Sequence, residues 1–129
     1  MVSVMSKATW RKPEKLKSRK RIEQVFREGK SFTLFPYKVV YLISPAGAPL
    51  QAGFGAGSRN FKKAVDRNRI KRLGREAFRL QKGPLLDQLT QKGLAMAVFF
   101  VFTGRELPDY PTVSARIGVA LQKLLKETA

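Results

Sequence analysis

The chain has 129 residues, and its 26 Lys and Arg against 9 Asp and Glu give a formal net charge of +17 at pH 7. It contains no cysteine and no histidine, which excludes disulfide bonds, thiolate nucleophiles and the usual zinc and histidine-base sites. A hydrophobic fraction of 43% suits one globular domain and excludes a merely disordered basic tail. This charge predicts a polyanionic partner, with nucleic acid first and an anionic membrane surface a distant second.

The ends and the apolar runs of the chain bear on its compartment. The apolar run Leu94–Phe102 covers nine residues and is too short to span a membrane. The N-terminal residues lack a long apolar core before a small-residue cleavage site, so no signal peptide is expected and the predicted compartment is the cytoplasm. Residues 1–13 show no period and are expected to form a flexible basic arm before a single domain over residues 14–129.

The first predicted helix spans residues 18–29 and carries many basic residues on its outer side. Ser18 is a suitable N-cap, and Gly29 suits the position just beyond the C-terminal end. The apolar stripe of this helix consists of Ile22, Val25 and Phe26.

Two strands are predicted next. Residues 37–44, YKVVYLIS, are rich in β-branched and aromatic side chains. Residues 50–58, LQAGFGAGS, follow a Pro- and Gly-rich turn, so the two strands are expected to pair as an antiparallel hairpin. Glycines alternate along the second strand, which indicates close backbone approach or a bend. GFGAG lacks the spacing of phosphate-binding glycine loops, so a nucleotide site is rejected.

A strongly basic helix is predicted to begin near Ala64 and to end before Gly83-Pro84. Like charges four residues apart repel by a few tenths of a kcal/mol, and an ordinary solvated face usually mixes signs. The single sign therefore favours a polyanion-binding surface. The expected apolar stripe is Ile70, Leu73, Ala77 and Leu80. The expected cationic face lies opposite this stripe and consists of Arg67, Lys71 and Arg75, with Arg72, Arg79 and Lys82 beside them.

The C-terminal third predicts a turn of helix, a strand and a final helix. Leu85, Leu86 and Leu89 indicate the turn of helix, and residues 94–102 a strand with both faces covered. Thr112 is the expected N-cap of the last helix. The inward residues of that helix are expected to be Val113, Ile117, Ala120 or Leu121, and Leu124. One small sheet packed by helices buries all of these stripes, which predicts an α+β fold.

The segment AVDRNRIKRLGREAFR, residues 64–79, resembles the signature of the bacterial ribonuclease P protein subunit, A-V-x-R-N-R-I-K-R-x-x-R-E-x-F-R. VFREGKSF resembles the first helix of that family and its glycine exit, and PYKVVYL its first long strand. GFGAGSRNFKKA stands in the place of the strand that leads into the basic helix. The resemblance runs from about Leu16 to the last helix.

The resemblance implies a single-domain α-β-β-β-α-β-α sandwich with a left-handed crossover through the basic helix, against the general right-handed rule. The implied function is that of the protein subunit of the ribonucleoprotein endoribonuclease ribonuclease P, which binds the catalytic RNA and the leader of precursor tRNA. It would assist magnesium-dependent removal of the leader during tRNA processing. The chain is expected to act as a monomeric protein without membrane contact.

The resemblance also assigns residues to two surfaces. Residues assigned to the RNA subunit lie on the basic helix and just before it: Lys62, Lys63, Arg67, Asn68, Arg69, Lys71, Arg72, Arg75 and Arg79. A cleft between the first helix and the sheet would take the single-stranded leader, where Phe26 and Tyr41 match family aromatics that stack on bases. Both are also typical core residues, and Ile22 replaces a further family aromatic. The expected cleft residues are Lys17, Phe26, Tyr37, Val39 and Tyr41.

Hydrolysis is not expected from the protein itself. Its nine acidic residues are scattered without a D-x-D pair, so no metal ligand is assigned and magnesium is expected to be held mainly by the RNA. The nearest alternative is a structural RNA-binding protein of the ribosome or of another ribonucleoprotein. A DNA-binding module would place the basic helix in a major groove. A protein-only nuclease is disfavoured by the scattered carboxylates and the missing histidines.

Overall fold

The computed structural model describes residues 15–16, 18–45 and 47–129, so the predicted arm over residues 1–13 lies outside it. Four helices and four strands make up this described part. In chain order they are α2 (Arg19–Glu28), β1 (Lys30–Leu34), β2 (Tyr37–Ser44), β3 (Leu50–Ala56), α3 (Ala64–Gln81), α4 (Gly83–Lys92), β4 (Ala95–Phe102) and α5 (Tyr110–Glu127).

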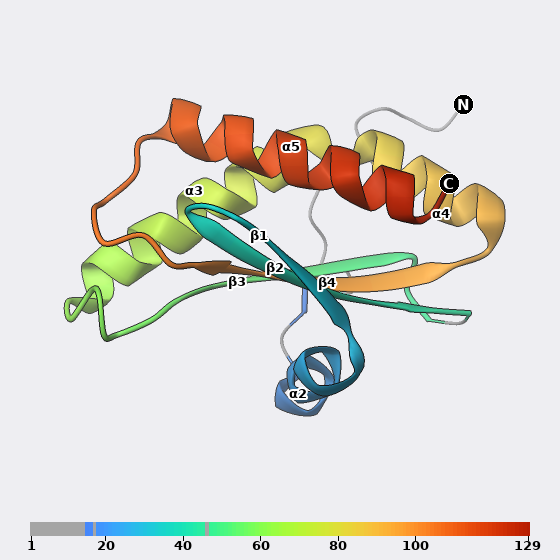
Figure 1. Cartoon of the computed structure of the whole chain (residues 1–129), viewed down its shortest axis with the longest axis horizontal. Coiled ribbons are helices and arrows are strands. Elements are labelled where there is room, and N and C mark those ends of the chain that lie inside the picture. Colours follow the sequence, from blue (N-terminus) through green and yellow to red (C-terminus); the bar gives the residue numbers. More distant parts are fainter. Residues whose placement is uncertain (1–14, 17, 46) are drawn as a thin grey trace.

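The strands form one sheet in the order β1-β2-β4-β3, with β4 antiparallel to β2 and parallel to β3 (Figure 1). The expected hairpin between the strands at 37–44 and 50–58 is therefore wrong, because β4 lies between them. β4 is apolar along its whole length and is covered on both faces, so it takes a central place in the sheet. The antiparallel hairpin is instead β1–β2, where Leu34 pairs with Tyr37 across Phe35 and Pro36.

The connection from β3 to β4 passes through α3 and α4. In Figure 1 both strands run to the left, the helices lie above the sheet, and the chain passes from β3 at the rear to β4 nearer the viewer. This is a left-handed crossover, as the resemblance implies and against the usual preference.

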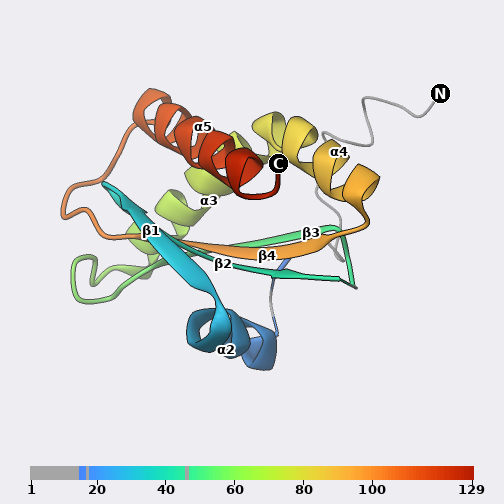
Figure 2. The same ribbon diagram turned by 45° about the vertical axis from the view of Figure 1, so that its right-hand side comes forward.

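Helices α3, α4 and α5 cover one face of the sheet, and α2 covers part of the other (Figure 2). Successive residues of a strand point to opposite faces, so β2 contributes to both layers. Val39 packs into the larger core with the residues of α3 and α5, whereas Val40 packs with Val25 of α2. The α5 residues expected to face inward, from Val113 to Leu124, are all buried.

Close approach explains the glycines of β3 and α3. A Cβ on Gly53 or Gly55 would come within 2.8 or 3.0 Å of the Phe99 ring, and one on Gly74 within 2.8 Å of the Phe54 ring. Phe54 stacks on Phe100 with ring centroids 5.0 Å apart. The missing side chains therefore leave room for the partly buried rings of Phe99 and Phe54 against the backbone.

The bounds of α3 match the prediction, but its buried stripe differs. Ile70 and Ala77 are buried as expected, and Gly74 and Phe78 join them. Leu80 is 56% exposed, which makes its placement in the stripe wrong, because the larger Phe78 fills the core side of that turn instead.

Lys82 is also misplaced by the sequence argument, since its side chain is only 1% exposed. It lies at the junction between α3 and α4, where the chain changes direction, and not on the exposed face of a continuous helix.

Of the two predicted N-caps, Ser18 is confirmed and Thr112 is wrong. The Ser18 hydroxyl accepts a hydrogen bond from the backbone nitrogen of Arg21 at 3.3 Å, as expected of an N-cap. For α5 the expected cap, Thr112, is wrong. The cap is Asp109, whose carboxylate accepts from the Thr112 nitrogen at 3.0 Å. Hydrogen bonding to the Thr112 side chain, and then to its backbone nitrogen, lowers the pKa of Asp109.

Candidate nucleic-acid interface

The exposed side of α3 gathers the predicted cations. Its buried stripe faces the sheet and α5, so the 3.6-residue period turns the basic positions towards solvent. Asn68, Arg69 and Arg72 are exposed. The placement of Arg67, Lys71 and Arg75 opposite the stripe is wrong, because all three are half-buried along one flank of it. The exposed Lys62 and Lys63 extend this surface just before the helix. We call the set the α3 surface: Lys62, Lys63, Arg67, Asn68, Arg69, Lys71, Arg72, Arg75 and Arg79.

Arg67 has a structural role that the sequence argument missed. Its Nη1 donates to the carbonyl oxygens of Phe61 at 2.7 Å and of Lys62 at 2.9 Å, which holds the loop before α3 against the first turn of the helix. The N-cap residue, Lys63, makes no capping bond with its side chain. Arg67 therefore shapes the end of the α3 surface as well as adding charge to it.

Asn60 fixes the same loop from the other side. Its side-chain nitrogen donates to the carbonyl oxygens of Thr103 at 3.4 Å and of Gly104 at 3.3 Å. The loop that leads into α3 is thereby tied to the loop after β4. An asparagine before the basic run gave no sequence signal for this contact, because its partners lie more than forty residues away.

Arg79 is the predicted member of the α3 surface whose charge is most compensated. Its guanidinium pairs with Glu76 at 2.6 Å, and this hydrogen bond lowers the pKa of the Glu76 carboxyl. Exposed pairs of this kind contribute little to stability, about 0–1 kcal/mol. The local partner leaves Arg79 the weakest anion-binding candidate of the helix.

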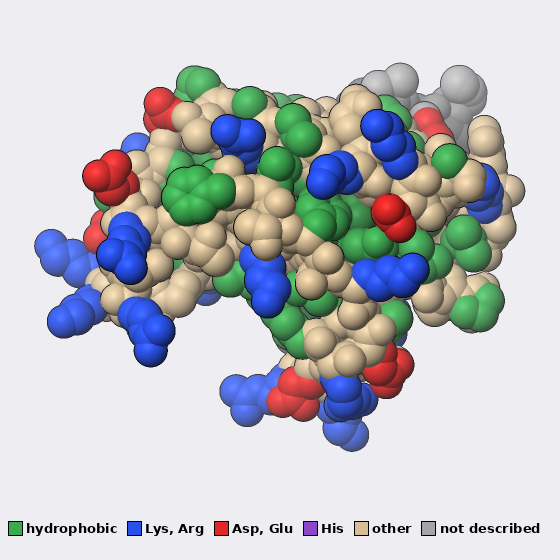
Figure 3. All heavy atoms as spheres, in the orientation of Figure 1, with side chains coloured by type: hydrophobic (Ala, Val, Ile, Leu, Met, Phe, Trp, Pro, Cys, Tyr) green, Lys and Arg blue, Asp and Glu red, His purple; other side chains and the backbone are tan. Residues whose placement is uncertain are grey.

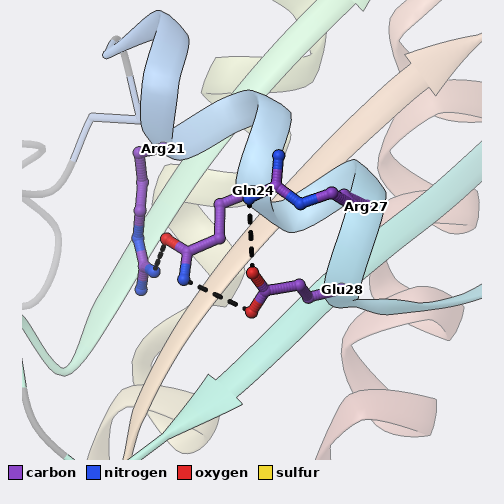
Figure 4. Close-up of polar contacts among 4 residues, drawn as sticks. All are labelled: Arg21, Gln24, Arg27 and Glu28. Atoms are coloured by element: carbon purple, nitrogen blue, oxygen red, sulfur yellow. Dashed lines mark hydrogen bonds and ion pairs between the residues drawn. The ribbon is translucent and has the colours of Figure 1, made fainter.

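The outer side of α2 is more balanced in charge than α3 (Figure 4). Arg21 donates to Gln24 at 2.8 Å, Gln24 to Glu28 at 3.5 Å, and Arg27 pairs with Glu28 at 3.3 Å. These contacts engage two of the cations of α2 within its own helix. Of these two helices, α3 carries the larger excess of basic side chains.

A second surface lies beside α2, where β3 and β4 present the face away from the other helices. The Phe26 ring is 44% exposed and lies 5.4 Å from that of Phe99. Phe99 in turn lies over the glycines of β3. In the next cross-strand row stand Lys38, Val101 and Gly55. Because the leader cleft was expected here, we call this surface the α2 cleft: the Phe26 and Phe99 rings beside the glycines of β3, flanked by Lys38.

Three residues expected in that cleft are elsewhere. Tyr37, Val39 and Tyr41 point to the opposite face of the sheet, in the core under α3–α5, and each is at most 4% exposed. The residues of β2 on the α2 side are Lys38, Val40 and Leu42, one position out of register with the expectation. Assigning Tyr37, Val39 and Tyr41 to a cleft with the first helix is wrong.

The structure places Phe26 and Ile22 on the α2 side of the sheet, but in different surroundings. Phe26 does lie beside the sheet with part of its ring exposed, so its role in leader binding stays a prediction. Ile22 is half-buried against the small core around Val25, which is the core reading of that position. Lys17 lies outside the described residues.

The position of Tyr37 in the core leads to a prediction about stability. Within the described residues its hydroxyl is buried without a hydrogen-bond partner, and burial raises its pKa to about 12. We expect Tyr37→Phe to leave the free energy of unfolding at pH 7 unchanged or to raise it by up to about 1 kcal/mol, because it removes an unpaired polar group. Urea denaturation checks this, and a loss above about 1 kcal/mol would contradict it.

The same change should alter the response to alkali. A tyrosine in the unfolded chain ionises near pH 10, whereas Tyr37 in the fold holds its proton to about pH 12. Rising pH between these values draws protons from the unfolded state first, so it favours unfolding. The difference in stability between wild type and Tyr37→Phe should therefore grow in favour of the variant across this window, while the lysines titrate equally in both.

Two further properties of the described part limit the chemistry of the site. No group of three or more His, Cys, Asp or Glu side chains is placed there to hold a metal ion. Of the helices described, none has the length and apolar character needed to cross a membrane.

Comparison with known proteins places the chain. The family model described as Ribonuclease P matches residues 10–126. The ribonuclease P protein component of Porphyromonas gingivalis is 39% identical over 119 residues, covering 88% of this chain and 82% of the relative. That of Symbiobacterium thermophilum is 44% identical over 70 residues, covering 54% and 60%.

Solved structures agree in fold. The ribonuclease P protein of Staphylococcus aureus superposes with a TM-score of 0.59 at 20% identity, covering 90% of this chain and 95% of that one. A mutant of the S. aureus protein, described as defective in mRNA degradation, gives 0.63 at 18% identity over 98% and 97%. The family match spans nearly the whole chain, and the P. gingivalis relative extends over most of both sequences. This chain therefore belongs to the ribonuclease P protein component family.

Proposed function

We propose that this chain binds the catalytic RNA of ribonuclease P through the α3 surface and assists removal of the leader from precursor tRNA. The observation that carries the proposal is the excess of basic side chains on α3, which has six Lys and Arg residues against Asp66 and Glu76. Lys71, Arg72 and Arg75 follow one another along the helix without an acidic residue among them. Their mutual repulsion is relieved when phosphates neutralise them and release counterions.

The α2 cleft is the proposed place for the leader. An unpaired nucleotide offers a flat base and a phosphate, and the cleft offers aromatic rings at Phe26 and Phe99 with Lys38 nearby. Stacking of this kind tolerates any base, because every base has a π-face. Such tolerance suits a leader whose sequence differs from one tRNA precursor to the next.

Hydrolysis is assigned to the RNA and to magnesium ions that it holds. The donor set of the described residues supports this assignment, because several carboxylates already have other tasks. Glu76 pairs with Arg79, Glu28 pairs with Arg27, and Asp109 caps α5. The protein then contributes positive charge and substrate affinity, and the reacting phosphodiester is left to the metal ions.

Reconstitution tests the proposal. The chain is added to a bacterial ribonuclease P RNA at a magnesium concentration at which the RNA alone is slow, and release of the leader is followed on labelled precursor tRNA. We expect the chain to restore cleavage, and polylysine at equal charge to fail. Restoration by polylysine would reduce the role to charge screening, and cleavage by the protein alone would overturn the division of labour.

A further inference from the structure

A hollow of about 420 Å³ lies between the edge strand β1 and the last turns of α5, on the face of the sheet opposite α2. Figure 3 views the molecule from the β1 edge of the sheet, with α5 above it, and shows Lys and Arg side chains over both elements. The hollow is separate from the α3 surface and the α2 cleft, since its lining comes from β1, β2 and α5. Its charged and aromatic lining residues are Lys30, Lys123, Lys126, Phe32, Tyr41 and Glu127.

One lysine of the hollow is held in place by the aromatic wall. The Lys123 ammonium lies 5.0 Å from the centroid of the Phe32 ring, a cation–π contact, and that ring packs against Tyr41 at 6.1 Å. The ammonium therefore has a defined position at the mouth of the hollow. Because Lys123 covers the face of Phe32, this ring does not offer a platform for a base.

The hollow also contains one carboxylate, that of Glu127. Tyr41 and Glu127 both line the hollow, and burial, followed by the hydrogen bond to Glu127 and the charge of Glu127, raises the pKa of Tyr41. A carboxylate has about four acceptor sites, so Glu127 retains capacity for a hydroxyl of a ligand.

We propose that this hollow binds one ribonucleotide unit, with its phosphate between Lys30, Lys123 and Lys126 and its ribose 2′-hydroxyl donating to Glu127. A bare phosphate suits the lysines but is repelled by the carboxylate. A ligand that joins an anion to a hydroxyl donor satisfies both. The volume falls in the range of about 300–1,000 Å³ that small-ligand sites occupy.

The proposed contacts determine the specificity. Phosphate and sugar are recognised and the base is not, so base sequence should matter little. The 2′-hydroxyl is the group by which a protein distinguishes RNA from DNA at a given position. A nucleotide within an RNA chain and a free mononucleotide share this chemistry, so the experiment includes both.

The test follows the ring signals of Phe32 and Tyr41 by NMR in the full chain. The chain is titrated with hexauridylate, with the deoxyribose oligomer of the same sequence, and with uridine 5′-monophosphate. We expect RNA to shift both rings and to bind about tenfold more tightly than DNA, as one hydrogen bond to a charged group allows. If the hexamer binds more tightly than the mononucleotide, the ligand of the hollow is an RNA chain. If the two bind equally, the ligand is a free nucleotide. Unshifted rings, or equal affinities for RNA and DNA, overturn the proposal.

Two variants sharpen the result. Glu127→Gln keeps an acceptor for Tyr41 but loses the charge, so the preference for RNA over DNA should fall from about tenfold towards one. The triple variant Lys30→Ala, Lys123→Ala, Lys126→Ala should bind RNA at the rings at least about tenfold more weakly. Persistence of the wild-type ring shifts in the triple variant would overturn the proposal.

A matched control separates this hollow from the α3 surface. The triple variant Lys92→Ala, Arg105→Ala, Arg116→Ala removes the same charge from outside both sites and should keep the ring shifts. Backbone signals of α3 report RNA contact there independently. If RNA shifts the ring signals of Phe32 and Tyr41 but not the backbone signals of α3, the result counts against the proposed function alone. If RNA shifts the α3 signals but not the ring signals, it counts against the hollow alone.

Discussion

Replacing Lys71, Arg72 and Arg75 with alanine should weaken binding to ribonuclease P RNA by about 100- to 500-fold at 0.1 M salt. Each phosphate contact adds roughly 0.7–0.9 to the slope of log affinity against log salt, so three lost contacts lower the slope by about 2–3. With about six phosphate contacts, the affinity of the wild type should fall by some three orders of magnitude between 50 and 200 mM salt. The affinity of the variant, with about three contacts, should fall by about one and a half orders of magnitude. Filter binding or fluorescence anisotropy across this salt range measures both quantities.

Arg67 is left out of this variant because of its bonds to the loop before α3. Its removal would change the shape of the site together with its charge, and the two effects could not be separated. The three chosen positions lie within α3, where alanine is the most favourable helix residue, so the helix is expected to remain intact. Circular dichroism and the melting temperature check this.

The control for charge is Lys92→Ala, Arg105→Ala, Arg116→Ala, which lowers the net charge equally but leaves α3 unchanged. It should reduce the affinity for ribonuclease P RNA only a few-fold through the general field of the protein. Equal losses in the two triple variants would contradict the assignment of the interface to α3.

Local signals allowed α3 to be predicted from the sequence. Its start, its end and its basic side follow from a 3.6-residue period and from the stop signal at Gly83-Pro84. The exposure of Leu80 did not follow, because two apolar residues, Phe78 and Leu80, competed for the core side of one turn. The burial of Lys82 depends on the junction with α4, which no local pattern encodes.

The order of the strands could not be obtained in this way. A turn between β2 and β3 favours a hairpin, because strands adjacent in sequence are often neighbours in a sheet. Pairing is decided by a competitor far along the chain, β4, whose apolar residues gain more from a central position. That gain depends on which surfaces are covered by α2 on one side and by α3–α5 on the other.

The sequence also does not show which face of β2 points towards α2. One alternate set of its residues is Tyr37, Val39 and Tyr41, and the other contains Val40 and Leu42. Because both sets are largely apolar, the alternation does not identify the face towards α2, and a shift of one residue reverses every assignment. The placement of Phe26 was not ambiguous in this way. Phe26 belongs to the apolar stripe of a helix, and a helix has one such stripe to turn towards the sheet.

The second large effect is expected at Phe26. Phe26→Ala should weaken the affinity of the reconstituted enzyme for precursor tRNA by about 5- to 150-fold, because one stacked base contributes roughly 1–3 kcal/mol. Affinity for ribonuclease P RNA should stay within about twofold, because the cations of α3 supply that binding. Equilibrium binding of labelled precursor to the holoenzyme measures the first quantity, and titration of the RNA with protein the second.

Mature tRNA provides the substrate control for this prediction, since it carries no leader. Wild type and Phe26→Ala should bind it alike. Phe26→Leu keeps apolar packing against Phe99 but removes the aromatic face, so it should retain the melting temperature and still lose leader affinity. Tyr37→Phe, on the opposite face of the sheet, should bind precursor tRNA as wild type does. Equal weakening of precursor and mature tRNA by Phe26→Ala would indicate damage to the fold, and no weakening of precursor binding would remove the leader from the α2 cleft.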